Sequence, residues 1–576
     1  MSSTDFKNID EQVPLNQSIK KEKTIRDNGY FSSSYSVKKI QAGICLLLVE
    51  LCERFTFFEV VCNMIPFCTV KLGYPNYHAA ILNLCFIGTS LLAPMFAGWL
   101  AEICVGRNKL IYICLVLHFL GTVLLSVVAF PSEDFYMGSY HVINYTTKEE
   151  QKRLFYLALS AICVGIGGIR VVVCPLGAYS LQEYGSRKQM SFFNWFYWRM
   201  NLNATVVFLG IAYIQHSRGW ALVLLIPFMS TLMALITLHM MYSKLIHQPE
   251  KCCSLLTTFG VFFNALKIYC LRYYHLGRGV TGCLDQAKKV NGGCCSEFHV
   301  EDAKGFLLLL PLCIFQLLYR MCIMQIPSGY YLQTMNSSLN VNGFLLPVAI
   351  MNVMSTLPLL ILTPLMEYFR TCLFSSKREG PFLLACILVG HLSVVLSVMV
   401  AGFLEMHRKD FPSMEQTLSG KVILVSSMPC FHLAFQYILL GVAETLVNPA
   451  LSELSCRFVP RRIGGTSVSV SSLCNGLSCF LGAALVELVY LLSEGNWFPN
   501  TLNKGNLENF FFFLASLTLL NVLGLCTVSQ RYYHLNPAQN NRSNLEETLL
   551  LQEKSLNLYG SLQEFSSSID LWETAL

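Results

Sequence analysis

Twelve long apolar stretches constrain the fold of this chain more than any other feature of its sequence. A helix that crosses the hydrocarbon core of a bilayer needs roughly 20 predominantly apolar residues. Lipid offers no hydrogen bonds, so a spanning segment must satisfy its own backbone groups, as a helix does. The sequence therefore predicts an all-α polytopic membrane protein with 12 transmembrane helices. The predicted spans lie near residues 40–66, 79–100, 110–130, 154–178, 191–214, 220–242, 305–326, 342–366, 382–404, 421–448, 464–492 and 509–529.

The proportion of charged residues agrees with this prediction. Only 13% of the 576 residues are charged, whereas a water-soluble chain carries about 25%. These charges are too few to cover the surface of a water-soluble protein of this size. We therefore expect lipid to cover much of the surface of this protein. The first 39 residues are polar and lack the apolar core of a signal peptide, so we expect the first apolar stretch to remain as an anchor.

The longest polar connection, from Ser243 to Lys304, divides the apolar stretches into six and six. Transporters built from two related halves bind substrate between them, near the middle of the membrane. The predicted organisation is a cytoplasmic N-terminal tail (1–39), an N-terminal six-helix bundle (40–242), a cytoplasmic central loop (243–304), a C-terminal six-helix bundle (305–529) and a cytoplasmic C-terminal tail (530–576).

The distribution of lysine and arginine predicts the orientation. Most of these residues fall in the tails and in alternate loops, which places both termini in the cytosol. The sequons at Asn144 and Asn336 then lie on outer loops and are predicted glycosylation sites, whereas the sequon at Asn541 lies inside. Glu546, Leu550 and Leu551 have the spacing of an acidic-dileucine sorting signal, which implies sorting adaptors as partners. The predicted location is the plasma membrane or an endosomal or lysosomal membrane.

The sequence does not favour an enzyme or a metalloprotein. Most of the 24 cysteines lie in apolar stretches, where they act as small hydrophobic side chains. The doublets Cys252-Cys253 and Cys294-Cys295 lack the C-x-x-C spacing of zinc sites. No H-E-x-x-H, G-x-S-x-G or P-loop pattern occurs, and no basic module for nucleic acid is present. We therefore predict no metal, no cofactor and no nucleic-acid partner.

Ionisable residues inside the apolar stretches are the main functional signal. A charge at the centre of a membrane costs roughly 2.5–3.5 kcal/mol on insertion scales. Glu50 and Arg54 are four residues apart on the first span and can pair along one helix face. Glu53 can receive a cation from another helix, and Arg170 is the candidate. The alternative is that these charges serve only to hold helices together. Further charges in the spans are Arg199, Arg320 and Glu444.

A short connection between the second and third spans carries a separate motif. An acidic residue near a helix end, a glycine turn and a basic residue can form a cytoplasmic latch between two helices. This pattern resembles the G-x-x-x-[DE]-x-x-x-G-[RK] loop signature of the major facilitator superfamily. Its residues are Gly98, Glu102, Gly106 and Arg107.

Several motifs together resemble the proton-coupled oligopeptide transporters of that superfamily, in particular their peptide/histidine branch. Glu50-x-x-Glu53-Arg54-Phe is similar to the helix 1 signature of the family. The other motifs are Gly165-Ile-Gly-Gly-Ile-Arg170 for helix 4, Phe196-Tyr197-x-x-Met-Asn201 for helix 5, Gln325-x-x-x-x-Tyr330-x-Leu-Gln333 for helix 7, and Gln436-Tyr437-x-x-x-x-Gly441-x-x-Glu444 for helix 10. The resemblance spans about residues 40–530.

The resemblance implies a role for each matching position. Glu50, Glu53, Arg54 and Arg170 would form the proton-linked cluster, with the proton gradient as the driving force and no cofactor. Glu444 would meet the amino group of a substrate. Asn201 and Gln325 would line the cavity.

The chain departs from the family pattern at the expected substrate pocket. Phe57 and Phe58 replace a tyrosine pair, and Val61 replaces an arginine that helps hold the peptide carboxylate. Arg170 stands where the family has lysine, and a guanidinium does not release its proton, so a proton-operated switch must titrate on Glu53 or Glu50. We hypothesise that Arg320 replaces the lost carboxylate clamp.

Three functions remain open on this basis. The first is a proton-coupled symporter of small peptides, histidine or related zwitterions that works by alternating access. The second is a transporter of a different solute such as an organic anion, because the internal arginines are numerous. The third is a transport-deficient sensor or adaptor with a transporter fold, which the lost tyrosines favour.

Overall fold

The computed structural model describes residues 44–45, 48–100, 106–129, 148–179, 186–218, 225–241, 288, 297–341, 344–373, 379–418, 421–458, 464–500 and 502–528. Within them, eight helices are long and apolar enough to cross a membrane. The first helix covers residues 48–66 and the last covers Leu507–Val528. The helices between them are α2 (Asn76–Leu100), α3 (Arg107–Ala129), α4 (Lys148–Tyr179), α5 (Ser186–Arg218), α7 (Ile226–Met241), α10 (Glu297–Ile323), α11 (Tyr331–Met335), α12 (Ile350–Leu373), α13 (Glu379–Asp410), α14 (Ala434–Phe458) and α15 (Gly464–Leu492).

The chain divides into two compact units, and the first helix, α2 and α4 each contribute to both. Unit 1 comprises Met1–Phe57, Ala93–Gly177 and Leu224–Cys252, and unit 2 comprises Phe58–Leu92, Ala178–Val223 and Cys253–Leu576. The expected boundaries of the two six-helix bundles stay a prediction.

Unit 1 is built around the close packing of α4 on α3. A Cβ atom on Gly168 would lie 2.2 Å from the Cys114 sulfur, and one on Gly165 would lie 2.4 Å from His118 Cβ. Small residues at such a contact let two helix backbones approach closely, which is how membrane helices gain van der Waals contact without a hydrophobic driving force. The core beside this contact contains Val49, Cys52, Ile111, Leu115, Ile169, Ala234 and Leu238. This packing fixes the position of Arg170, which follows the two glycines on α4.

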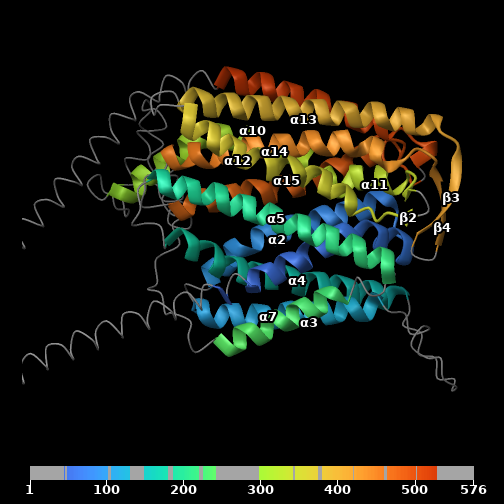
Figure 1. The fold of residues 1–576 in the computed structure, drawn as a ribbon, viewed down its shortest axis with the longest axis horizontal. Helices are drawn as coiled ribbons and strands as arrows, with labels where there is room; N and C mark the ends of the chain where they lie inside the picture. Colours follow the sequence, from blue (N-terminus) through green and yellow to red (C-terminus); the bar gives the residue numbers. More distant parts are fainter. Residues whose placement is uncertain are drawn as a thin grey trace, which may run out of the picture. The chain divides into compact units, whose positions relative to one another are not determined.

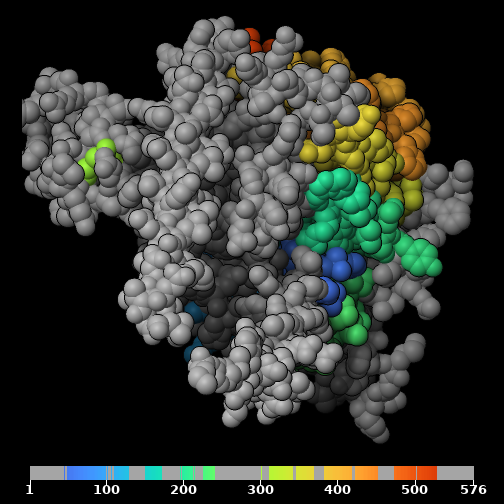
Figure 2. Space-filling model, turned by 60° about the vertical axis from the view of Figure 1, so that its left-hand side comes forward, coloured from blue at the N-terminus to red at the C-terminus, as the bar shows by residue number. Residues whose placement is uncertain are grey.

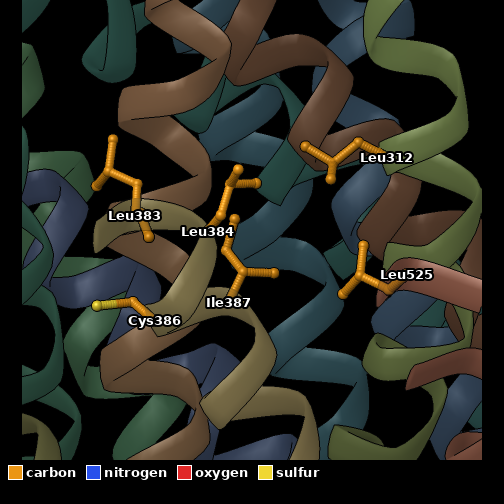
Figure 3. Packing of buried hydrophobic residues seen from close by; sticks show 7 residues of the cluster. Leu312, Leu383, Leu384, Cys386, Ile387 and Leu525 are labelled. Atoms are coloured by element: carbon orange, nitrogen blue, oxygen red, sulfur yellow. The ribbon is translucent and has the colours of Figure 1, made fainter. Parts of the chain in front are cut away.

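Unit 2 contains α14 packed along both α12 and α13, with α5 against α12 and α10 against α15 (Figure 1). Figure 2 shows the surfaces of α5 and α12 meeting on one face of the molecule. Two hydrogen bonds join this helix pair: Trp198 Nε1 donates to the Leu360 carbonyl at 3.0 Å, and the Thr205 and Thr356 hydroxyls lie 2.7 Å apart. An apolar cluster where α13 meets α10 and the last helix consists of Leu312, Leu383, Leu384, Cys386, Ile387, Ala450 and Leu525 (Figure 3).

Two π-helical turns occur beside prolines in unit 2. The first helix ends at Pro66 and continues as η1 (Phe67–Lys71), and α10 is followed by η5 (Ile326–Tyr330), which contains Pro327. A proline lacks the backbone N–H that a regular helix needs, so the local hydrogen-bond pattern widens. Asn83 on α2 joins the two helices concerned, because its Nδ2 donates to the carbonyls of Val61 and Pro327.

Two predicted span boundaries were wrong. The span predicted at 421–448 begins as a β-strand, because β3 (Ser413–Leu418) and β4 (Lys421–Ser426) form an antiparallel hairpin. A one-turn 3₁₀ helix, η7 (Cys430–Leu433), then leads into α14. The span predicted at 342–366 likewise begins at Ile350, after a short pairing of β1 (Asn340–Val341) with β2 (Phe344–Leu345). Mean hydropathy does not separate a short apolar strand from the end of a helix. The span predicted at 305–326 lies on α10, which begins at Glu297 and ends at Ile323. A further short 3₁₀ helix, η9 (Leu502–Lys504), precedes the last helix.

Candidate functional site

The first component of the candidate site is a buried ion pair in unit 1. Arg170 on α4 donates from Nε and Nη2 to Glu53 Oε1, at 3.1 and 2.9 Å. The Glu53 side chain is fully buried and that of Arg170 is 9% exposed. The attraction and the hydrogen bonds between the two charges offset part of the free energy that is lost when both leave water. A single buried charge has no such compensation. The structure therefore brings together the two residues that the sequence predicted to meet.

Further side chains lie around this pair. Arg54 Nε lies 3.6 Å from Glu53 Oε2, so one carboxylate faces two guanidinium groups. The Arg170 guanidinium also lies 4.7 Å from the centre of the Phe57 ring, a cation–π contact. Glu50, one turn earlier, is buried, at 4% exposure. The predicted pairing of Glu50 with Arg54 stays a prediction, whereas Phe57 supplies an aromatic face to the Arg170 guanidinium.

The second component is another ion pair, in unit 2. Arg320 near the end of α10 donates from Nη1 to Glu444 Oε1 on α14 at 3.2 Å. Arg320 Nη2 also donates to Asn448 Oδ1, and Asn448 Nδ2 donates to the Tyr197 hydroxyl on α5. Three helices thus contribute to one polar chain. Its two charges are largely buried, at 10% and 20% side-chain exposure.

Each charge of this second pair was predicted to have a role, but their contact with each other was not predicted. Arg320 and Glu444 were assigned to the carboxylate and amino ends of a substrate, and no acidic residue near Arg320 in sequence suggested a partner. Asn448 and Tyr197 were not predicted as functional residues. The available signals were the spacing of Glu444 and Asn448, four residues apart on one helix face, and the place of Tyr197 in the helix 5 motif.

The two polar residues expected to line a cavity make local hydrogen bonds in unit 2. Asn201 Nδ2 donates to the Tyr197 carbonyl at 2.8 Å, one turn earlier on α5. Gln325 is buried, and its Nε2 donates to the Met321 carbonyl at 3.4 Å. Their expected role toward a substrate stays a prediction. Gln333 of the helix 7 motif joins three helices. It lies on α11, accepts a hydrogen bond from Gln436 on α14 at 2.9 Å and donates to the Ala401 carbonyl on α13.

Part of the predicted latch is described. Gly98 lies near the end of α2, and Gly106 directly precedes α3 with a φ of 78°, a conformation that residues with a Cβ rarely adopt. The turn therefore requires glycine at position 106. Glu102 and the side chain of Arg107 lie outside the described part of the chain, so the latch contact stays a prediction.

The predicted modification and sorting sites are described only at Asn336. Its Nδ2 donates to the Leu332 carbonyl at 2.8 Å, and Ser337 and Ser338 of the same sequon are buried. A glycan on this nitrogen would replace one of its two hydrogens and would have to fit beside these buried serines. Asn144, the sorting residues Glu546, Leu550 and Leu551, the central loop except for Lys288 and 297–304, and both tails lie outside the described residues.

The described residues contain no group of three or more His, Cys, Asp or Glu side chains that could hold a metal ion. The chemistry available in the two components is instead the exchange of protons and of ionic partners. A carboxylate can gain a proton or another cation, whereas a guanidinium keeps its charge and has to find another anion.

Comparison with known proteins gives consistent matches. The family profile described as PTR2, POT family, matches residues 108–501. Human solute carrier family 15 member 5 is 72% identical over the full length of both chains. Protein NRT1/PTR FAMILY 8.1 of Arabidopsis thaliana is 24% identical, covering 84% of this chain and 92% of the relative. A crystal structure of an auto-inhibited POT family peptide transporter superposes with a TM-score of 0.64 at 16% identity, covering 85% of this chain and 97% of the other.

Proposed function

Since this chain belongs to the POT family of transporters, we propose that it is a proton-coupled symporter of small peptides, histidine or related zwitterions that works by alternating access. Family membership confirms the resemblance found in the sequence. It also confirms the 12-helix major facilitator fold and the prediction that the chain is a membrane transporter and not an enzyme. The observation that carries the proposal is the buried Glu53–Arg170 ion pair.

The proposed coupling step is protonation of Glu53. In its ionised form, Glu53 holds α4 against the first helix through two charged hydrogen bonds from Arg170. A proton on Glu53 removes the counter-ion, and Arg170 keeps its charge. The guanidinium is then left buried beside the Phe57 ring and a neutral acid, with only the weaker electrostatic attraction of Glu50, which destabilises this arrangement relative to another. Protonation thereby shifts the equilibrium between two conformations of the transporter. Such a shift is what couples proton binding to transport.

The proposed substrate contacts are Arg320 and Glu444. A zwitterion carries the two charges that these residues offer each other, so its carboxylate can replace Glu444 on Arg320 while its ammonium group replaces Arg320 on Glu444. Asn448 and Tyr197 hold the pair in place through their hydrogen bonds. Substrate entry therefore exchanges one ion pair for two, and no charge is left unpaired. Asn201 and Gln325 are proposed to complete the cavity.

The remaining features of the proposal follow from the sequence. Both termini are placed in the cytosol, and the driving force is a proton gradient from an acidic exterior or lumen. The signal at Glu546, Leu550 and Leu551 would direct the protein to an endosomal or lysosomal membrane through sorting adaptors. Asn144 is the proposed glycosylation site, and the turn at Gly106 is proposed to position a cytoplasmic latch.

The test is uptake of a labelled dipeptide and of labelled histidine into proteoliposomes across an imposed pH gradient. We expect uptake that a protonophore abolishes, and we expect Glu53→Gln to remove its dependence on the gradient. Arg320→Gln should raise the half-saturation concentration about 10- to 100-fold, as loss of a charge-assisted hydrogen bond implies. Glu415→Gln is the control, because Glu415 is an exposed carboxylate on β3. Gradient-independent uptake in the wild type would overturn the coupling mechanism.

A transport-deficient sensor is the second candidate, and the Arg320–Glu444 pair is the observation that favours it. These two charges neutralise each other, so the site has no net charge with which to attract a substrate. This alternative predicts that a ligand stabilises the purified protein while proteoliposomes accumulate none of it. A third possibility, an organic anion as substrate, predicts that anions compete for uptake and that dipeptides and histidine do not.

A further inference from the structure

Glu59 is a buried acidic residue for which the proposed mechanism has no use. It lies on the first helix, six residues after Glu53 in the sequence, and belongs to unit 2. Its relative exposure is 0%. Asn63 Nδ2 donates to Glu59 Oε1 at 3.3 Å and also to the Glu59 carbonyl at 3.1 Å. Among the residues that the structure describes, none is a hydrogen-bond partner of Oε2.

Within the described part of the chain, the groups found around Glu59 are polar and none of them is a cation. Cys62, one turn later, lies within electrostatic reach of Glu59. The Cys62 thiol contacts the Tyr331 hydroxyl on α11 at 3.4 Å and accepts a hydrogen bond from Asn352 on α12 at 3.2 Å. A thiol and a phenol are the titratable groups here, and neither becomes a cation. Throughout the residues that the structure describes, no lysine or arginine forms an ion pair with Glu59.

Two further contacts of this part of the first helix are with neutral side chains. On the α2 side, Asn83 donates to the backbone of the first helix. On the α5 side, the Phe208 ring packs edge-to-face against Phe58, with ring centres 5.2 Å apart. An ionised Glu59 would therefore be a full negative charge out of water with a single amide donor. Such an arrangement costs far more than a protonated acid in the same place.

Glu53 provides the contrast within the same helix. Glu53 receives two hydrogen bonds from a guanidinium and has a second arginine 3.6 Å away. Its ionised form is therefore compensated, whereas that of Glu59 is not. From this geometry we propose that Glu59 carries a proton in the described state and is a second proton-binding site of the protein, separate from the Glu53–Arg170 pair.

This site deepens the proposed function, and its link to transport rests on that function. The first helix would then carry two carboxyls that differ in occupancy: Glu53 ionised and paired, Glu59 neutral. A conformational change that brings a cation or water to Glu59 would release its proton. The site would thus add a second proton to the transport cycle without any further ion pair.

Infrared spectroscopy of the purified protein tests the proton on Glu59 directly and needs no transport activity. At neutral pH, we expect a carboxylic-acid C=O band in the wild type that shifts in heavy water and is absent from Glu59→Gln. Glu415→Gln should retain the band, because that carboxylate is exposed. Identical spectra for the wild type and Glu59→Gln would overturn the proposal. So would a sodium-dependent rise in thermal stability that Glu59→Gln removes, because it would identify a metal-ion site.

Uptake measurements then test the role of this proton. Gln keeps the shape of the protonated acid but does not release a proton. We expect Glu59→Gln to preserve folding and to lower the number of protons carried per substrate, measured from the reversal potential in proteoliposomes. Glu59→Asp should retain the wild-type number. If the wild type shows no uptake, the proposed function fails, and the infrared band still decides whether Glu59 binds a proton. An unchanged proton number in Glu59→Gln would overturn its part in coupling.

Discussion

Breaking the Glu53–Arg170 pair from either side should have unequal consequences. Glu53→Gln removes the carboxylate that is hydrogen-bonded to Arg170 and leaves the buried guanidinium beside the Phe57 ring and Arg54, with only the weaker electrostatic attraction of Glu50. A guanidinium does not lose its proton. Arg170→Gln leaves a carboxylate that still has Arg54 at 3.6 Å and that can become neutral by taking a proton. We therefore expect Glu53→Gln to be the more destabilising substitution at neutral pH.

The magnitudes follow from the burial of the pair. Removing one partner of a buried ion pair costs about 3–5 kcal/mol, and we expect this loss for Glu53→Gln at every pH. For Arg170→Gln, the loss is limited by the free energy of protonating a carboxyl group. This free energy is about 1.4 kcal/mol for each pH unit above roughly pH 4.3 in water, or about 3.7 kcal/mol at pH 7 and about 1 kcal/mol at pH 5. The folded variant binds the additional proton, so its stability rises as the pH falls.

The assay is SDS-induced unfolding in mixed micelles at pH 7 and pH 5, followed by tryptophan fluorescence. Arg170→Gln should regain about 2–3 kcal/mol relative to the wild type on acidification, whereas Glu53→Gln should not. The control is Glu149→Gln, which breaks an exposed 3.0 Å pair with Lys152 on α4 and should cost at most about 1 kcal/mol. The double variant should cost less than the sum of the single ones. Additive losses, or the same pH response in both single variants, would refute the reasoning.

Three further predictions concern the scaffold and its surface. Gly441→Ala should destabilise the protein by about 1–3 kcal/mol in the same assay, because the added Cβ would lie 2.0 Å from the Ser355 carbonyl oxygen. Gly482→Ala is the control: the atom nearest to its added Cβ would be 3.5 Å away, so the free energy of unfolding should not change. Arg408→Met should cost about 3–5 kcal/mol in the same assay by leaving the buried Glu405 carboxylate without its guanidinium partner, and a loss under 1 kcal/mol would contradict this. For protein expressed in mammalian cells, Asn144→Gln should remove the gel-mobility shift that a glycosidase abolishes. Asn336→Gln should leave that shift unchanged. The reverse result would place the glycan on Asn336, which is half-buried.

The sequence was sufficient for the overall fold because membrane burial acts on each segment separately. Apolar stretches of about 20 residues have to form helices in lipid wherever their neighbours lie, so their number and approximate positions are readable without tertiary contacts. The same logic singled out Glu53 and Arg170, because a charge inside such a stretch needs a partner. The β3–β4 hairpin was missed because its apolar strand has the composition of a helix end.

Tertiary packing decided which charges meet and which remain alone. Arg320 and Glu444 are 124 residues apart, and nothing in local spacing indicates that α10 and α14 place them in contact. Glu59 lies six residues from Glu53 on the same helix, yet within the described ranges Glu53 has an ionic partner and Glu59 has none. The physical reason is that the cost of a buried charge is local, whereas its compensation depends on side chains supplied by other helices.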